Sequence, residues 1–158
     1  MITLRPYAPS DFDACLALFD GNCPTFFDRA ERDDFARFLS RHATAWHFLV
    51  VERDGRLLAC GGHAQNDDGR HASLCWGMVA RDHHRQGLGR RLLEARIAWC
   101  RRTPGIERIV LDTSQHTCAF YARFGFRVER VTPDGYGPDL DRYDMVLDLI
   151  ETSGDATG

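Results

Sequence analysis

The order in which strand-type and helix-type segments follow one another is the feature that most restricts the fold of this 158-residue chain. Period-two and β-rich runs predict strands, and apolar residues spaced three and four apart predict helices. A single domain is expected, because domains cluster at roughly 100–150 residues. The predicted strands cover Ile2–Arg5, His47–Arg53, Arg56–Gln65, His71–Val79, Arg108–Thr113, Arg127–Val131 and Arg142–Leu149; the predicted helices are one capped by Ser10, then Ala30–His42, Gly87–Arg102 and Thr117–Phe124.

The resulting order is β-α-α-β-β-β-α-β-α-β-β, which predicts the α/β (α+β) class. Consecutive strands followed by helix-linked strands indicate a mixed sheet with helices on both faces. The dipeptide Asp54-Gly55 between two β-type runs predicts a tight hairpin. The domain is expected to cover residues 1–150. Residues 151–158 are small and polar without periodicity, which predicts a flexible C-terminal tail.

Charge and hydropathy argue against several classes of protein. The formal net charge is −3, whereas a general nucleic-acid binder is usually basic. No apolar run approaches the roughly 20 residues of a membrane helix. The start of the chain, Met1 to Pro6, lacks the apolar stretch and cleavage site of a signal peptide. A soluble cytoplasmic protein that binds neither nucleic acid nor membrane is expected.

Two residue types narrow the chemistry. All 20 basic residues are arginine, which excludes Schiff-base chemistry and a P-loop lysine. The six cysteines form no C-x-x-C pair. The histidines His63, His83, His84 and His116 are scattered along the chain, so no metal site is predicted.

Ligand binding is predicted first in residues 79–93, where an apolar strand passes through a glycine loop into an amphipathic helix. Gly87 and Gly89 let an anion approach the backbone, and the first N–H groups of the helix have no internal partner. From Arg81 to Arg102, seven arginines stand against two acids, a local charge of +5 in an otherwise acidic chain. This charge suits a phosphate-bearing ligand. A dinucleotide fingerprint would need a third glycine where Leu92 stands.

A second constellation follows the strand Arg108–Thr113: Phe120-Tyr121 and then Gly125-Phe126. Together with Gly87-Leu88-Gly89 it resembles the GNAT superfamily of acyl-CoA-dependent N-acetyltransferases. Their pattern is Q/R-x-x-G-x-G/A at the third helix and [LF]-Y-x-x-x-G-F after the fifth strand. The resemblance covers residues 2–149. It implies a mostly antiparallel sheet of about six to seven strands flanked by about four helices.

The resemblance implies acetyl-CoA as co-substrate, a primary amine as acceptor and direct attack. Tyr121 would be the general acid that protonates the departing thiolate. The backbone of the fourth strand would pair with the pantetheine amides through Met78, Val79 and Ala80, and the Val79 N–H would meet the oxyanion. The pyrophosphate would lie on the N–H groups of Arg85, Gln86, Gly87, Leu88, Gly89 and Arg90.

Three positions depart from the family pattern. His84 stands where Gln or Arg is usual, and Ser114 stands where many relatives have Asn bonding to the pantetheine arm. Ser73 stands where many relatives have a glutamate base. His71 lies on the same face of the strand as Ser73 and would act through a water that Ser73 positions. Asp112, at the end of the fifth strand, is the competing candidate for the base. The sequence also allows that neither His71 nor Asp112 takes part in the reaction.

Two segments are expected to contact the acceptor. Phe26 and Phe27 offer aromatic faces next to Asp28, and Tyr136 lies in a loop expected over residues 133–141, which also carries three carboxylates. Such walls favour a small cationic amine. Two alternatives are a non-catalytic acyl-CoA-binding sensor and an enzyme that acetylates a peptide or protein. The sequence leaves the acyl chain and the oligomeric state open, a homodimer among the options.

Overall fold

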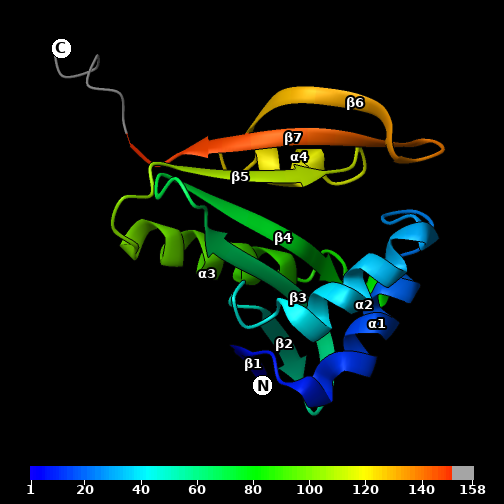
Figure 1. Cartoon of the computed structure of the whole chain (residues 1–158). Helices are drawn as coiled ribbons and strands as arrows, with labels where there is room; N and C mark the ends of the chain where they lie inside the picture. The colour runs from blue at the N-terminus through cyan, green and yellow to red at the C-terminus, as the bar shows by residue number, and fades with distance from the viewer. Residues whose placement is uncertain (151–158) are drawn as a thin grey trace, which may run out of the picture.

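Seven strands form one sheet in the computed structural model, which describes residues 1–150 (Figure 1). Their order is β1-β2-β3-β4-β5-β7-β6, and neighbours are antiparallel except for the parallel pair β4 and β5. The predicted α/β class and mostly antiparallel sheet are therefore confirmed. The strands are β1 (Ile2–Pro6), β2 (Leu49–Arg53), β3 (Arg56–Gln65), β4 (His71–Val79), β5 (Arg108–Thr113), β6 (Arg127–Gly137) and β7 (Leu140–Asp148).

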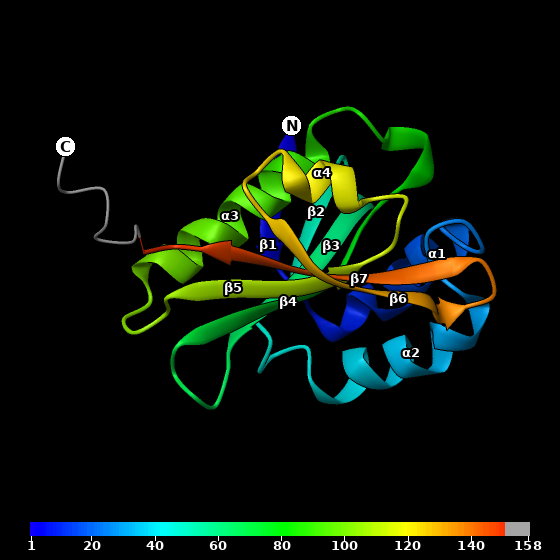
Figure 2. The ribbon, with the colours of Figure 1, turned by 90° about the horizontal axis from the view of Figure 1, so that it is seen from above.

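Helices cover both faces of the sheet. Figure 2 shows α3 on the opposite side of β3 and β4 from α2. Within residues 1–150 none of the helices is long and apolar enough to cross a membrane. The predicted tail, residues 151–158, lies outside the described residues. The helices are α1 (Phe12–Gly21), α2 (Arg32–Arg41), α3 (Leu88–Arg102) and α4 (Cys118–Ala122), with single turns η1 (Pro9–Asp11), η2 (Arg29–Glu31) and η3 (Arg81–His83).

The apolar faces predicted for the helices pack into the core. Phe19 of α1, Phe35 of α2 and Leu92 of α3 are buried. The cap predicted at Ser10 is wrong, because Ser10 lies inside η1 and makes no cap hydrogen bond. Asp11 takes the N-cap position of α1 instead, and its carboxylate accepts hydrogen bonds at 2.8 Å from both the Arg5 guanidinium and the Ala8 N–H.

The strands β4 and β5 pair over only three residues and then separate. His71, Ala72 and Ser73 pair with Arg108 to Val110, and beyond that point the two strands diverge (Figure 1). Trp76 has a φ of +48°, and the register of β3 and β4 shifts between Cys60 and Gly62. This bulge bends β4 away from β5, because an extra residue increases the local twist of a strand. The sheet is consequently open at one end.

One predicted turn is confirmed and one predicted loop is wrong. Asp54 and Gly55 both have positive φ and join β2 to β3 as a tight hairpin. Residues 133–141, expected to form a loop, instead extend β6 to Gly137 and begin β7 at Leu140. Side chains hold this end together: Asp141 accepts from the Asp134 N–H, and Asp134 accepts from the Asp139 N–H, each at 2.9 Å.

Candidate active site

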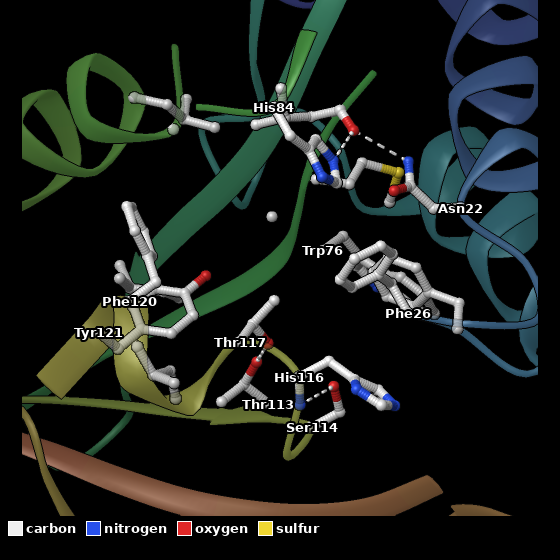
Figure 3. Close-up of a pocket in the computed structure, with 18 of the residues that line it drawn as sticks. Asn22, Phe26, Trp76, His84, Thr113, Ser114, His116, Thr117, Phe120 and Tyr121 are labelled. Carbon is white, nitrogen blue, oxygen red and sulfur yellow. Dashed lines mark hydrogen bonds between the residues drawn. The ribbon is translucent and has the colours of Figure 1, made fainter. Parts of the chain in front are cut away.

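A cavity of about 920 Å³ lies where β4 and β5 separate. Its walls come from the α1–α2 connection, the end of β4, the start of α3, the β5–α4 segment and β6. Figure 3 shows Phe26 and Trp76 across the cavity from Phe120 and Tyr121. The predicted site residues that line it are Phe26, Phe27, Met78, Val79, Arg85, Gly87, Gly89, Arg90, Asp112, Ser114, Tyr121 and Tyr136.

The loop between β4 and α3 presents a row of free N–H groups. Arg85 and Gly87 both have left-handed backbone angles, with φ of +67° and +81°. In the described chain, no N–H of residues 85–90 donates to another backbone group, and the first bond of α3 runs from the Arg91 N–H to the Gly87 carbonyl at 3.0 Å. Alternating backbone handedness turns successive N–H groups toward one point, which makes a concavity for an anion.

The end of β4 is tied to neighbouring elements. The Val79 carbonyl accepts from the Asn22 amide at 3.0 Å, and His84 Nε2 lies 2.9 Å from the same oxygen. The Ala80 N–H donates to the Leu58 carbonyl at 2.7 Å. The Val79 carbonyl and the Ala80 N–H are thus not free to pair with a pantetheine arm, which corrects that part of the sequence prediction. Ala80 also does not line the cavity.

The hydroxyl of Tyr121 points into the cavity from α4 (Figure 3). Edge-on contacts with Phe120 and Phe126, at ring-centroid distances of 5.2 and 5.9 Å, hold the ring. A methyl group placed on Gly77 of β4 would lie 3.3 Å from the Tyr121 oxygen. The phenol therefore faces the backbone of the separated strand, which is where the sequence prediction requires the thioester.

Below Tyr121, the β5–α4 segment is held by its own hydroxyl groups. Ser114 is 3% exposed and its hydroxyl accepts from the His116 N–H at 3.3 Å. Thr113 and Thr117 share a short hydrogen bond between their hydroxyls. Figure 3 shows these side chains along one wall of the cavity. Ser114 is placed to contact a ligand, although its hydroxyl already serves the turn into α4.

Acidic groups gather at the far end of the cavity. The Tyr136 hydroxyl donates to Asp112, and Arg142 lies 3.8 Å from the same carboxylate. Burial, and next the Asp112 carboxylate, raise the pKa of Tyr136. Glu31 also lines the cavity and accepts from the Asp28 N–H at 3.0 Å. Burial, opposed only in part by that hydrogen bond, raises the pKa of Glu31 to about 6.

His71 and Ser73 lie outside the cavity, at the closed end of the sheet. The His71 Nδ1 is 2.5 Å from the Asp68 carboxylate, and the Ser73 hydroxyl donates to Asn66 at 2.8 Å. Both side chains thus serve the turn between β3 and β4. Their placement does not support the predicted base and water pair, because the bulge redirects β4 only after Ser73.

Other predicted contacts also have structural roles. Asp28 caps η2 by accepting from the Ala30 N–H at 2.8 Å, and it lies against Gly137 of β6. Leu88 is buried in the core, and Gln86 does not line the cavity. The carboxylates of the 133–141 segment, among them Asp134 and Asp141, stabilise the β6–β7 hairpin. In the part of the chain that the structure describes, no group of three metal-ligating side chains is found.

Among the cavity residues that the sequence prediction did not include are Glu31, Trp76 and Arg96. Glu31 stands three residues after Asp28, the spacing of a capping box, which signals a helix start rather than a ligand. Trp76 stands within the predicted strand His71–Val79, where an aromatic residue is common and does not indicate a ligand site. Arg96 stands four residues after Leu92 and four before Cys100, so the sequence places a charge within the apolar stripe of α3. A charged residue within an apolar stripe is the sequence feature that could have identified Arg96.

The comparisons with known proteins agree with this geometry. A structure of a GNAT-family protein from Desulfovibrio desulfuricans superposes with a TM-score of 0.79 at 23% identity, covering 95% of this chain and 100% of that one. The ribosomal-protein-S18-alanine N-acetyltransferase of Escherichia coli gives a TM-score of 0.77 at 21% identity, with 98% of both chains covered.

A Salmonella typhimurium structure with its cofactor acetyl-CoA gives a TM-score of 0.73 at 23% identity, with 96% of both chains covered. At these identities the likeness shows the fold alone. No curated protein sequence matches the chain. The model of the acetyltransferase (GNAT) family matches residues 12–126. The chain therefore belongs to the GNAT family of acetyltransferases.

Proposed function

We propose that this protein transfers an acetyl group from acetyl-CoA to a primary amine by direct attack, without an acetylated enzyme intermediate. One observation carries the proposal: the loop with free N–H groups lines the same cavity as Tyr121, through Arg85, Gly87, Gly89 and Arg90. An anion site and a proton donor in one cavity suit a ligand with a diphosphate at one end and a thioester at the other.

The co-substrate would span the cavity from the start of α3 to α4. The pyrophosphate would lie on the N–H groups of the 85–90 loop, beside the Arg85 and Arg90 side chains that line the cavity. The thioester would then lie between Gly77 and Tyr121, and the Val79 N–H would meet the oxyanion. Acetyl-CoA binding in the Salmonella protein of the same fold supports this assignment.

The acceptor would enter from the acidic end of the cavity. Glu31 and Asp112 face this end from two different elements, next to the aromatic rings of Phe27 and Tyr136. A carboxylate beside aromatic faces attracts a cationic amine and desolvates its alkyl part. We assign Glu31 as the group that takes the ammonium proton, since its pKa of about 6 leaves it ionised at neutral pH.

A small amine fits this end better than a peptide. Asp28, the N-cap residue of η2, packs directly on Gly137 of β6: a methyl group on Gly137 would overlap the Asp28 carboxylate. This contact leaves no passage for a peptide chain between Asp28 and Gly137. A thiol-release assay over polyamines, aminoglycosides, amino acids and short peptides tests this choice. Faster turnover of peptides than of small amines would contradict it.

The Tyr121→Phe variant tests the reaction itself. Loss of the phenolic proton should lower kcat by roughly 10²- to 10⁴-fold, because a positioned general acid contributes about that much. Binding of CoA, measured by calorimetry, should be unchanged. Tyr7→Phe, outside the cavity, is the control and should keep full turnover. A Tyr121→Phe enzyme with normal kcat would exclude Tyr121 as the acid.

The same measurements of CoA binding and thiol release distinguish the proposed enzyme from a non-catalytic acyl-CoA sensor. A non-catalytic acyl-CoA-binding protein would bind CoA and gain thermal stability from it. It would release no thiol with any amine of the panel.

A further inference from the structure

A buried arginine without an acidic partner lies under the central strands. Arg96 of α3 is 2% exposed, and among residues 1–150 no carboxylate lies within 4.0 Å of its guanidinium. Its Nη1 donates to the Gly62 carbonyl at 3.3 Å, and its Nε has no partner. Buried charges are normally paired, so this arrangement calls for a reason beyond packing.

Two glycines make room for this guanidinium. A methyl group on Gly61 of β3 would lie 3.0 Å from the Arg96 Cζ atom, and one on Gly77 of β4 would lie 3.0 Å from the Arg96 Nη2 atom. Side chains at these positions would press on the guanidinium. The backbone is therefore shaped to let Arg96 reach the cavity, which it lines.

The guanidinium and the phenol of Tyr121 meet at the same point of β4. The methyl position on Gly77 that lies 3.0 Å from Arg96 Nη2 also lies 3.3 Å from the Tyr121 oxygen. A sulfur atom that accepts a hydrogen bond from Tyr121 at this point is a close neighbour of the guanidinium. Coulomb attraction between opposite charges at such a distance strengthens as the surroundings become less polar, and Arg96 itself is 2% exposed.

The groups around Arg96 are held in their neutral forms. Burial raises the pKa of the Cys75 thiol to about 12 and that of Cys60 well above its ordinary value. Burial, and next Arg96 itself, lower the pKa of His63 to about 4. At neutral pH the two thiols and the imidazole carry no charge, so none of them cancels the charge of Arg96.

We propose that Arg96 stabilises the negative charge that forms on the CoA sulfur when the thioester breaks. This inference rests on the proposed function. In that step the amine nitrogen bonds to the acetyl carbon and gives up one proton to solvent, and the C–S bond breaks with its electron pair going to sulfur. The Tyr121 hydroxyl then gives its proton to the sulfur, and solvent restores it. The charge moves from sulfur to the phenol oxygen, and both positions neighbour the guanidinium.

The test compares Arg96→Met with Arg96→Lys. Methionine keeps much of the volume without the charge, and it should fold, because an arginine with an unsatisfied Nε gives up little when replaced by an apolar side chain. We expect Arg96→Met to lower kcat by roughly 10- to 100-fold. Arg96→Lys, which keeps a cation, should recover part of the loss.

A second readout needs neither turnover nor an acceptor. The thiolate absorbance of bound CoA, followed against pH, gives the pKa of its sulfur. In the unmodified protein this pKa should lie below the ordinary value of about 8.5, and in Arg96→Met it should return toward that value. Desulfo-CoA should bind both proteins equally well, since it has no sulfur to interact with Arg96.

The outcomes separate the two proposals. If CoA fails to bind the unmodified protein, or if Tyr121→Phe keeps full kcat, the proposed function fails. If CoA binds and Tyr121→Phe is impaired, but Arg96→Met keeps both its kcat and the pKa of the bound thiol, the role of Arg96 alone is refuted. If thermal melts show that Arg96→Met is unfolded, the pKa of the bound CoA thiol is measured by the same absorbance titration in Arg96→Lys and Arg96→Gln instead.

Discussion

Two titratable side chains, the half-buried Glu31 and the buried His63, dominate the chemistry at the scale of single residues. Burial disfavours the charged form of each, so the pKa of Glu31 rises to about 6 and that of His63 falls to about 4. Glu31 faces the cavity, whereas His63 packs against the rings of His47 and Trp99, with centroid distances of 5.3 and 4.6 Å. The first therefore bears on activity and the second on stability.

Glu31 should set the acid side of the pH profile. The carboxylate attracts the acceptor only when ionised, so kcat/KM should fall as the pH drops through about 6. Glu31→Gln should lower kcat/KM by roughly 10- to 100-fold and remove this limb, because it removes a charged hydrogen-bond partner. Asp33→Asn, on the exposed first turn of α2, is the control. If kcat/KM of Glu31→Gln still falls as the pH drops through about 6, a group other than Glu31 causes that fall.

His63 should make the fold less stable in mild acid. The unfolded chain binds a proton at about pH 6.5, whereas the folded protein does so only near pH 4. Between these values the unfolded state binds more protons, so the free energy of unfolding decreases as the pH falls from 6.5 to 4. The loss from this residue should reach roughly 3 kcal/mol.

Urea unfolding across this pH range measures the effect. His63→Phe should show a flatter pH dependence, since phenylalanine packs against Trp99 without a group that titrates. His42→Gln, at the exposed end of α2, should keep the full dependence and is the matched control. Equal slopes for the unmodified protein and His63→Phe would show that other groups cause the acid sensitivity.

At the scale of elements, the start of α3 depends on a left-handed glycine. Gly87 has a φ of +81° and Gly55, in the β2–β3 turn, has +80°, and a methyl group at either position would meet no atom within 4 Å. Both Gly87→Ala and Gly55→Ala should therefore cost a similar backbone strain of roughly 1–2 kcal/mol. The pair forms a matched test of what the loop does.

Only Gly87→Ala should weaken the binding of CoA, by roughly tenfold, because its methyl group enters the space in front of the free N–H groups. Calorimetry on both variants checks this, and equal CoA affinity in the two would argue against a diphosphate at the loop. The β6–β7 hairpin shows the same dependence on local geometry, since Gly137 has no room for a side chain beside Asp28.

At the scale of the whole molecule, the two arms of the sheet are joined at β4 and β5 over only three residue pairs. A ligand that bridges the gap should stabilise the fold. CoA at about 100 times its Kd adds about 2.7 kcal/mol, which for a chain of this size raises Tm by roughly 5–10 °C. Pantetheine without the diphosphate should give a smaller shift. Equal shifts would show that the 85–90 loop contributes nothing.

The sequence determined which elements form and in what order. The apolar spacing in α2 and α3, the Asp54-Gly55 turn and the glycine loop before α3 are local patterns, and each was predicted correctly because neighbouring residues decide it. The family motifs around Gly87 and Tyr121 are local as well. The two motifs could therefore be recognised in the sequence without knowledge of the tertiary structure.

The tertiary structure decided which side chains share the cavity. The bulge at Trp76 leaves His71 and Ser73 at the closed end of the sheet, and packing of η2 against β6 brings Glu31 to Asp112 and Tyr136. Arg96 reaches the neighbourhood of Tyr121 because Gly77, which lies beside both, and Gly61, which lies beside Arg96, have no side chains. These contacts connect residues far apart in the chain, and no local spacing encodes how strands separate or how a hairpin packs.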